Sequence, residues 1–145
     1  MFRITRYFSR LFVLVALTLS APFAGIAAEL PHIVLLATGG TIAGAGRSAG
    51  EAGYKPSALP VEHLVNAVPE IASFARLTGE QIAQVDSQSM TTAIWLRLVQ
   101  RINTLLADRA VDGIVVTHGT DTLEETAYFL HLTVKSRKPV VITGS

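Results

Sequence analysis

The order of hydrophobic and polar residues along the chain predicts strands that are buried on both faces. Residues 139–142 form another strand candidate, and continuous apolar runs of β-forming residues occupy residues 33–37 and 113–116. Such runs are typical of strands inside a parallel sheet, where neither face meets water. Two weaker strand candidates, residues 71–77 and 81–85, lie on either side of a glycine. The pattern therefore predicts a sheet made of short, mostly buried strands.

Segments with helical spacing separate these strands. Residues 91–106 place apolar side chains three and four positions apart, and residues 123–134 do the same. A shorter helix is predicted at residues 61–67, and a long glycine-rich loop at residues 44–57. Strands that alternate with amphipathic helices favour an α/β fold, with a largely parallel sheet and flanking helices.

The first 28 residues have the composition of a secretory signal peptide. Three arginines and no acidic residue precede residue 11, residues 11–19 are apolar except for one threonine, and small residues follow up to Ala28. A basic start, a short apolar segment and a small-residue end are typical of export signals. The alternative is an N-terminal membrane anchor, for which the apolar run is short. We therefore expect cleavage after Ala27 or Ala28, and a periplasmic domain formed by residues 29–145.

The composition then excludes several classes of protein. The 145 residues contain no cysteine, which excludes a disulfide scaffold, a thiol nucleophile and a cysteine-bound zinc or iron–sulfur site. The hydrophobic share of 50% excludes a disordered chain. The net charge is +1 without a block of basic residues, so no nucleic-acid partner is expected. The four histidines have no metal-ligand spacing, and His118 is interpreted as a hydrogen-bonded structural residue.

Small polar residues follow three of the predicted strands. These loops span residues 38–41, 86–89 and 117–121. Because ligands of parallel α/β sheets bind beyond the carboxyl ends of the strands, we expect the three loops to converge on one binding site. They supply hydroxyls, an amide and a carboxylate, together with glycines that allow a ligand to approach the backbone closely.

The polar residues of these loops also have structural alternatives. Thr41 could belong to a turn or cap a helix, and Ser87 and Gln88 precede a predicted helix by a few positions. Asp121 stands three residues before Glu124, which is the spacing of a capping box. The residue types alone therefore leave both capping and catalysis open.

Two longer segments resemble the active-site signatures of a known family. Residues 33–44, IVLLATGGTIAG, are similar to the first signature of the bacterial asparaginase and glutaminase family. Residues 113–128, GIVVTHGTDTLEETAY, are similar to the second signature, and residues 86–90 lie between the two as in the family. The resemblance covers residues 30–145. It implies the N-terminal part of that family's larger N-terminal domain, in the exported type II branch.

The resemblance implies catalytic roles for four residues. Thr41 is similar to the nucleophile that attacks the side-chain amide and forms an acyl-enzyme. Tyr54 matches the tyrosine that assists this threonine, and Thr120 matches a second catalytic threonine that acts with Asp121 and a lysine. An ester intermediate divides amide hydrolysis into two easier steps, with ammonia released first and aspartate second.

The resemblance also implies how a small-molecule substrate is held. Ser87, Gln88, Thr120 and Asp121 match substrate-binding residues, including those for the α-carboxylate and α-ammonium groups. The expected substrate is L-asparagine, with L-glutamine as an alternative because one methylene group separates the two. A non-catalytic amino-acid-binding module is the alternative from another class. No metal or organic cofactor is implied.

The resemblance also bears on the extent of the chain. The family's catalytic lysine and its second domain follow the position of Ser145. We therefore expect an N-terminal fragment that has little or no amidase activity alone. The family's homotetramer is expected for the full-length enzyme, because its sites lie between subunits.

Overall fold

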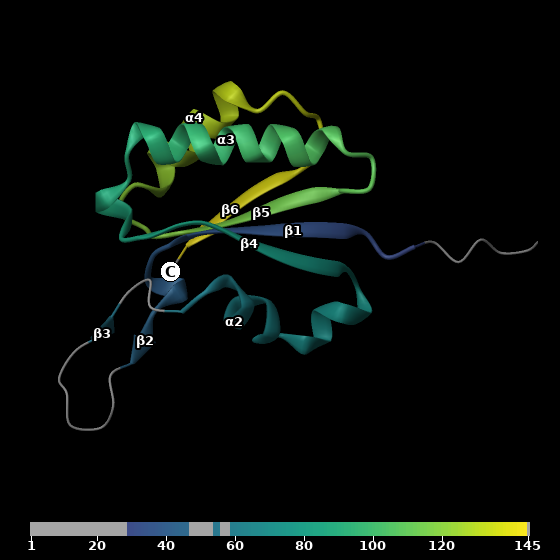
Figure 1. Cartoon of the computed structure of the whole chain (residues 1–145), viewed down its shortest axis with the longest axis horizontal. Helices are drawn as coiled ribbons and strands as arrows, with labels where there is room; N and C mark the ends of the chain where they lie inside the picture. The colour runs from purple at the N-terminus through teal and green to yellow at the C-terminus, as the bar shows by residue number, and fades with distance from the viewer. Residues whose placement is uncertain (1–28, 47–53, 56–58, 145) are drawn as a thin grey trace, which may run out of the picture.

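The computed structural model describes residues 29–46, 54–55 and 59–144, and a parallel β-sheet lies at its centre (Figure 1). The sheet has four strands in the order β4-β1-β5-β6. In chain order the strands are β1 (His32–Gly39), β4 (Arg76–Val85), β5 (Gly113–His118) and β6 (Val140–Gly144). Each neighbouring pair is parallel. The predicted α/β fold with a largely parallel sheet is confirmed.

Helices cover both faces of this sheet. Two long helices, α3 (Thr92–Ala107) and α4 (Leu123–Thr133), lie together on one face, and α2 (Val61–Asn66) lies on the other (Figure 1). The three predicted helices are therefore confirmed. Short 3-10 helices connect the elements: η1 (Thr41–Ala43), η2 (Pro69–Ser73) and η3 (Ser87–Ser89).

The prediction of two separate strands around Gly79 is wrong, because β4 runs through this glycine without a break. The start of the first candidate belongs instead to η2, which begins at Pro69, where the proline ring favours a helical φ angle. Gly79 lies against α2: an added Cβ would be 2.8 Å from Val61 Cγ2 and 2.9 Å from Val65 Cγ2. The glycine at this position therefore lets α2 pack closely on β4, and it does not form a turn.

A small antiparallel ladder forms part of the predicted glycine-rich loop. β2 (Ala45–Gly46) pairs with β3 (Tyr54–Lys55). Beyond the ladder, the backbone N–H of Leu59 donates to the carbonyl of Ala43 at 2.8 Å, which ties this segment back to η1. The remainder of the loop lies outside the described residues.

The predicted signal peptide, residues 1–28, also lies outside the described residues. Its assignment therefore rests on the sequence. Within the part of the chain that the structure describes, no helix has both the length and the apolar character needed to cross a membrane.

Two hydrophobic clusters hold the layers together. The larger cluster lies between the sheet and the α3–α4 layer and includes the fully buried Leu36, Leu98 and Ile114. The smaller cluster joins Leu35 of β1 to Val61 of α2. Successive strand residues face opposite sides of a sheet, so neighbouring leucines of β1 enter different clusters. Burial of such a side chain stabilises the fold by about 1.5–3 kcal/mol. The two clusters thereby hold the strands, and the loops that follow them, in fixed positions.

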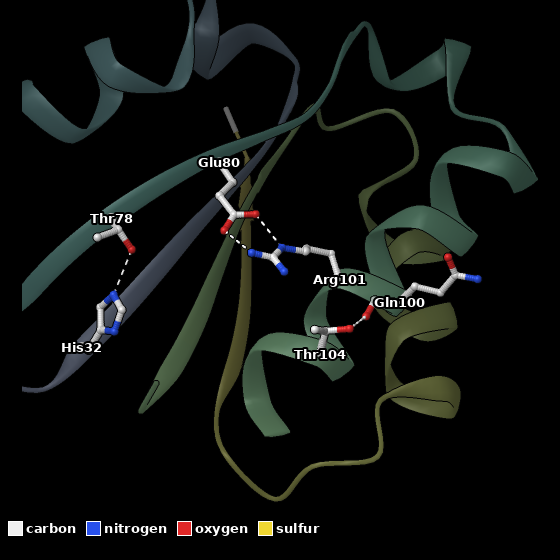
Figure 2. Close-up of polar contacts among 6 residues, drawn as sticks. All are labelled: His32, Thr78, Glu80, Gln100, Arg101 and Thr104. Atoms are coloured by element: carbon white, nitrogen blue, oxygen red, sulfur yellow. Dashed lines mark hydrogen bonds and ion pairs between the residues drawn. The ribbon is translucent and has the colours of Figure 1, made fainter. Parts of the chain in front are cut away.

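A bidentate ion pair joins the edge strand β4 to α3 (Figure 2). Arg101 Nε and Nη2 donate to the two carboxylate oxygens of Glu80, each at 2.6 Å. These hydrogen bonds hold the pKa of Glu80 below its ordinary value. The side chains of Glu80 and Arg101 are 35% and 40% exposed, so solvent screening limits the stabilisation to less than about 1 kcal/mol.

We expect Glu80→Gln to lower the free energy of unfolding by less than about 1 kcal/mol at neutral pH. A carboxyl group whose pKa falls on folding stabilises the protein above its unfolded pKa, and this contribution is lost as the pH falls through the folded value. The difference from the parent should therefore shrink below about pH 4. Urea unfolding at a series of pH values measures the free energy of unfolding of both proteins. Glu70→Gln, at an exposed position, is the charge-matched control. A difference that does not change with pH would contradict the assignment.

Candidate functional site

Three loops meet at the carboxyl end of the sheet, as the sequence predicts. At the end of β1, Gly39 and the following Gly40 adopt φ angles of +113° and +80°. The backbone of Gly40 packs on the loop after β5, since a Cβ added at Gly40 would lie 2.4 Å from the nitrogen of Gly119. Gly119 packs in turn on η3, because a Cβ added there would lie 2.6 Å from Ser87 Oγ. The absence of side chains at these glycines therefore brings the three loops into contact.

Ser87 and Asp121 are joined by two hydrogen bonds across this contact. Ser87 Oγ donates to Asp121 Oδ2 at 3.0 Å and accepts from the Asp121 backbone N–H at 3.1 Å. Thr122 Oγ1 adds a third bond by donating to the Ser87 carbonyl at 2.8 Å. Ser87 is buried, whereas Asp121 is exposed. The serine therefore holds the aspartate carboxylate at the surface, just before α4.

The capping alternative is wrong for Asp121. The N-cap residue of α4 is Thr122, and its side chain makes no capping hydrogen bond. The Asp121 carboxylate accepts from Ser87 instead. Helix α3 is capped by Thr91, whose Oγ1 accepts from the backbone N–H of Ile94 at 3.3 Å. Ser87 and Asp121 therefore cap neither helix.

A cavity of about 160 Å³ lies where the loops meet. Its lining comes from all three loops: Gly40, Asp86, Ser87, Gln88, Gly119, Thr120 and Asp121. This volume suits a small metabolite, since pockets for drug-sized ligands measure about 300–1,000 Å³. A hollow of about 340 Å³ beside α4 has a lining of mixed polarity, and one of about 510 Å³ beside η2 has a mainly apolar lining. Among the described residues, no group of three or more metal-ligating side chains is found.

The structure brings four of the six predicted site residues to this cavity, namely Ser87, Gln88, Thr120 and Asp121. Thr41 is the first residue of η1 and directly follows Gly40, which lines the cavity. Tyr54 lies in β3. The side chains of Thr41 and Tyr54 lie outside the described part of the structure, and their roles stay predictions.

Sequence reasoning assigned no role to Asp86 and misplaced the end of a strand. Asp86 lines the cavity, and its position directly after β4, in the predicted loop at residues 86–89, is the signal that could have identified it. Thr117 and His118 are the last residues of β5 and do not belong to the loop that follows. They continue the parallel pairing with β6, which the apolar pattern could not indicate because both are polar.

The structural interpretation of His118 is confirmed. The residue is fully buried, and both ring nitrogens are hydrogen-bonded. Nδ1 lies 2.7 Å from the carbonyl oxygen of Gly119, and Nε2 lies 2.9 Å from Thr126 Oγ1 of α4. His118 therefore supports the cavity from behind and does not face it.

Fold and site together define a parallel α/β domain with a small polar pocket at the carboxyl ends of β4, β1 and β5. Residues 32–145 match the family described as "Asparaginase, N-terminal". The chain belongs to this family.

Individual relatives agree with this membership. L-asparaginase 2 of Bacillus subtilis is 60% identical over 81% of this chain and 32% of its own length. The "Probable L-asparaginase periplasmic" of Haemophilus influenzae is 52% identical over 82% of this chain and 34% of its own length. The family also includes proteins named glutaminase-asparaginase, such as that of Pseudomonas fluorescens, which is 49% identical over 81% of this chain and 33% of its own length. The chain thus spans about a third of the length of the relatives it matches.

A solved structure is similar to this chain in fold. It is the crystal structure of a "Probable Cytoplasmic L-asparaginase" from Campylobacter jejuni, with a TM-score of 0.73 and 51% sequence identity. The similarity covers 79% of this chain and 35% of that one. The names of the relatives thus differ in cellular location while the fold is shared.

Proposed function

We propose that this chain carries the nucleophile and much of the substrate pocket of an enzyme that hydrolyses L-asparagine to L-aspartate and ammonia. The observation that carries the proposal is the Asp121 carboxylate, held by Ser87 in a small cavity that is also lined by Gly40, the residue directly before Thr41. Membership in the asparaginase family supports the same conclusion.

In this proposal Thr41 is the nucleophile. Its Oγ bonds to the carbon of the side-chain amide, and the hydroxyl proton is transferred with the assistance of Tyr54 to the amide nitrogen. The bond from carbon to nitrogen then breaks, and the protonated nitrogen departs as ammonia. Water attacks the resulting ester and releases L-aspartate, which restores the threonine hydroxyl. We assign Thr120 as the second catalytic threonine, which acts together with Asp121.

Binding of the substrate uses the charge and hydrogen-bonding groups of the cavity. The Asp121 carboxylate is suited to the α-ammonium group, because a charge-assisted hydrogen bond is stronger than a neutral one. Ser87 donates its hydroxyl proton to Asp121 and so orients this carboxylate. We propose that the remaining polar groups of the amino acid form hydrogen bonds with Gln88, Thr120 and the backbone near Ser87.

L-Glutamine is the second candidate substrate, because relatives named glutaminase-asparaginase share this region. One methylene group separates the two amino acids, and such a difference changes binding by about 1–3 kcal/mol. Measurement of ammonia release from both amino acids would rank them.

We further propose export to the periplasm through the signal peptide at residues 1–28. The composition of that segment supports this location, as does the relative from Haemophilus influenzae that is named periplasmic. A homotetramer is proposed for the full-length enzyme. Cell fractionation and sedimentation of the expressed protein test these two proposals.

Asp121→Asn is expected to weaken binding of L-aspartate, the proposed product, by at least tenfold. It removes the negative charge next to the α-ammonium group, and a hydrogen bond to a charged group contributes about 1.5–3 kcal/mol. Isothermal titration calorimetry on the purified chain measures the dissociation constant. Glu125→Gln is the control, since it removes an equal charge from the first turn of the neighbouring helix. Equal affinity in Asp121→Asn and the parent would refute the assignment.

A further inference from the structure

A buried chain of hydrogen bonds lies directly behind the cavity. The indole Nε1 of Trp95 donates to Thr126 Oγ1 at 2.8 Å, and this hydroxyl lies 2.9 Å from His118 Nε2. His118 Nδ1 lies 2.7 Å from the carbonyl oxygen of Gly119. Thr126 and His118 are fully buried, and the Trp95 ring stacks on Phe129 at a centroid distance of 5.4 Å. The chain therefore links α3, α4 and β5 to a residue that lines the cavity.

The chemistry of the end groups fixes the direction of every bond in this chain. A carbonyl oxygen can only accept, so His118 Nδ1 must carry a proton and donate to Gly119. An indole N–H can only donate, so Thr126 Oγ1 accepts from Trp95 and has its own proton left to give. In a neutral ring with its proton on Nδ1, Nε2 carries no proton and accepts from Thr126 Oγ1. The geometry thus selects the Nδ1–H tautomer of the ring.

The last bond of the chain also orients a peptide group of the cavity. In a planar trans peptide, the carbonyl and the N–H of the next residue point in opposite directions. The Gly119 carbonyl points to the buried His118 ring, so the N–H of Thr120 points away from it. Gly119 and Thr120 both line the cavity, and Thr120 is exposed. The hydrogen-bond chain therefore turns this N–H toward the open side.

We propose that Thr126 is a positioning residue of the site. Through His118 it fixes the peptide between Gly119 and Thr120, so that the Thr120 N–H is presented to an oxygen atom of the bound amino acid. Thr126 contacts no substrate and acts entirely through the ring of His118. The part of this inference that concerns substrate rests on the proposed function, whereas the orientation of the peptide does not.

A purely structural role predicts different results. In that case the chain joins α3 and α4 to β5, and loss of the Thr126 hydroxyl lowers the stability without any effect on the cavity. Thr133 offers a matched control on the same helix. Its Oγ1 donates to the Phe129 carbonyl at 2.6 Å, and it does not line the cavity.

The test uses the full chain and the variants Thr126→Val, Thr126→Ser and Thr133→Val. Nitrogen-15 NMR of the parent is expected to show His118 with its proton on Nδ1 and Nε2 as an acceptor. Thr126→Val should shift the Thr120 amide signal and weaken L-aspartate binding about tenfold. Thr126→Ser keeps the hydroxyl and should restore both, and Thr133→Val should match the parent.

Each outcome decides between the two roles. A parent ring protonated on Nε2 overturns the proposal, whether or not Thr126→Val folds. An unshifted Thr120 amide in a folded Thr126→Val, or unchanged affinity for L-aspartate with lowered stability, also overturns it. If the parent does not bind L-aspartate, the proposed function fails, while the ring tautomer and the Thr120 amide still test the positioning role.

Discussion

Gly40→Ala is expected to destabilise the fold by about 3 kcal/mol. Gly40 has a φ of +80°, a conformation that costs a residue with a side chain about 1–2 kcal/mol. The added Cβ would lie 2.4 Å from the Gly119 nitrogen and 2.8 Å from the His118 carbonyl carbon. These are backbone atoms at the end of a paired strand, so they cannot rotate aside as a side chain can. The overpacking adds about 1–3 kcal/mol, which urea unfolding measures.

Gly113→Ala is the matched control, at the first residue of β5, the strand that ends beside Gly40. A Cβ added there would lie 3.1 Å from Pro139 Cγ and 3.3 Å from both Ile33 Cδ1 and the Pro139 carbonyl oxygen, so every contact is longer than the 2.4 Å contact at Gly40. Ile33 can adjust by rotation, so we expect a loss of less than about 1 kcal/mol. If the two variants unfold at the same urea concentration, the close packing of the ends of β1 and β5 is refuted.

Thr41→Ala is expected to reduce the rate of ammonia release from L-asparagine by at least about 1,000-fold, because removal of a nucleophile eliminates the covalent route. The assay uses a chimaera in which residues 32–145 replace the matched segment of the Bacillus subtilis L-asparaginase 2. This design supplies the rest of a known relative whose matched region is 60% identical. The affinity for L-aspartate should stay within a few-fold of the parent, since the substitution leaves Asp121 in place.

Thr104→Ala serves as the control for loss of a threonine hydroxyl. Thr104 lies on α3, and its Oγ1 donates to the Gln100 carbonyl at 2.9 Å (Figure 2). Turnover by this variant should equal that of the parent chimaera. Unchanged turnover in Thr41→Ala would show that Thr41 is not the nucleophile. A parent chimaera that binds L-aspartate but releases no ammonia would instead favour a non-catalytic binding module.

Most of the fold could be predicted because its elements carry strong local signals. The apolar run at residues 33–37 predicts β1, and the spacing of apolar residues along 91–106 predicts α3. Gly79 was misinterpreted because its role is set by α2, which packs on it from a distant part of the chain. A glycine that makes room for a helix and a glycine that forms a turn are identical in the sequence.

The candidate site was predictable in its location and less so in its internal contacts. The convergence of three loops follows from the parallel order of the strands. The hydrogen bond between Ser87 and Asp121 joins residues 34 positions apart. The sequence could not indicate it, because a helix-capping role was also open for each residue. The link between Trp95 and Thr126 was not predicted either, because it depends on the angle at which α3 meets α4.

His118 and Thr117 are adjacent in β5 and face opposite sides of the sheet. Thr117 is paired with Ala37 of β1, whereas the His118 ring meets Thr126 of α4. A slip of β5 by one residue would exchange these positions and leave Trp95 and Thr126 opposite a threonine. A misregistered sheet therefore cannot form the polar support behind the cavity. Under the proposed function, only correctly registered molecules are expected to bind L-aspartate, so this binding can be used to select them from a refolding mixture.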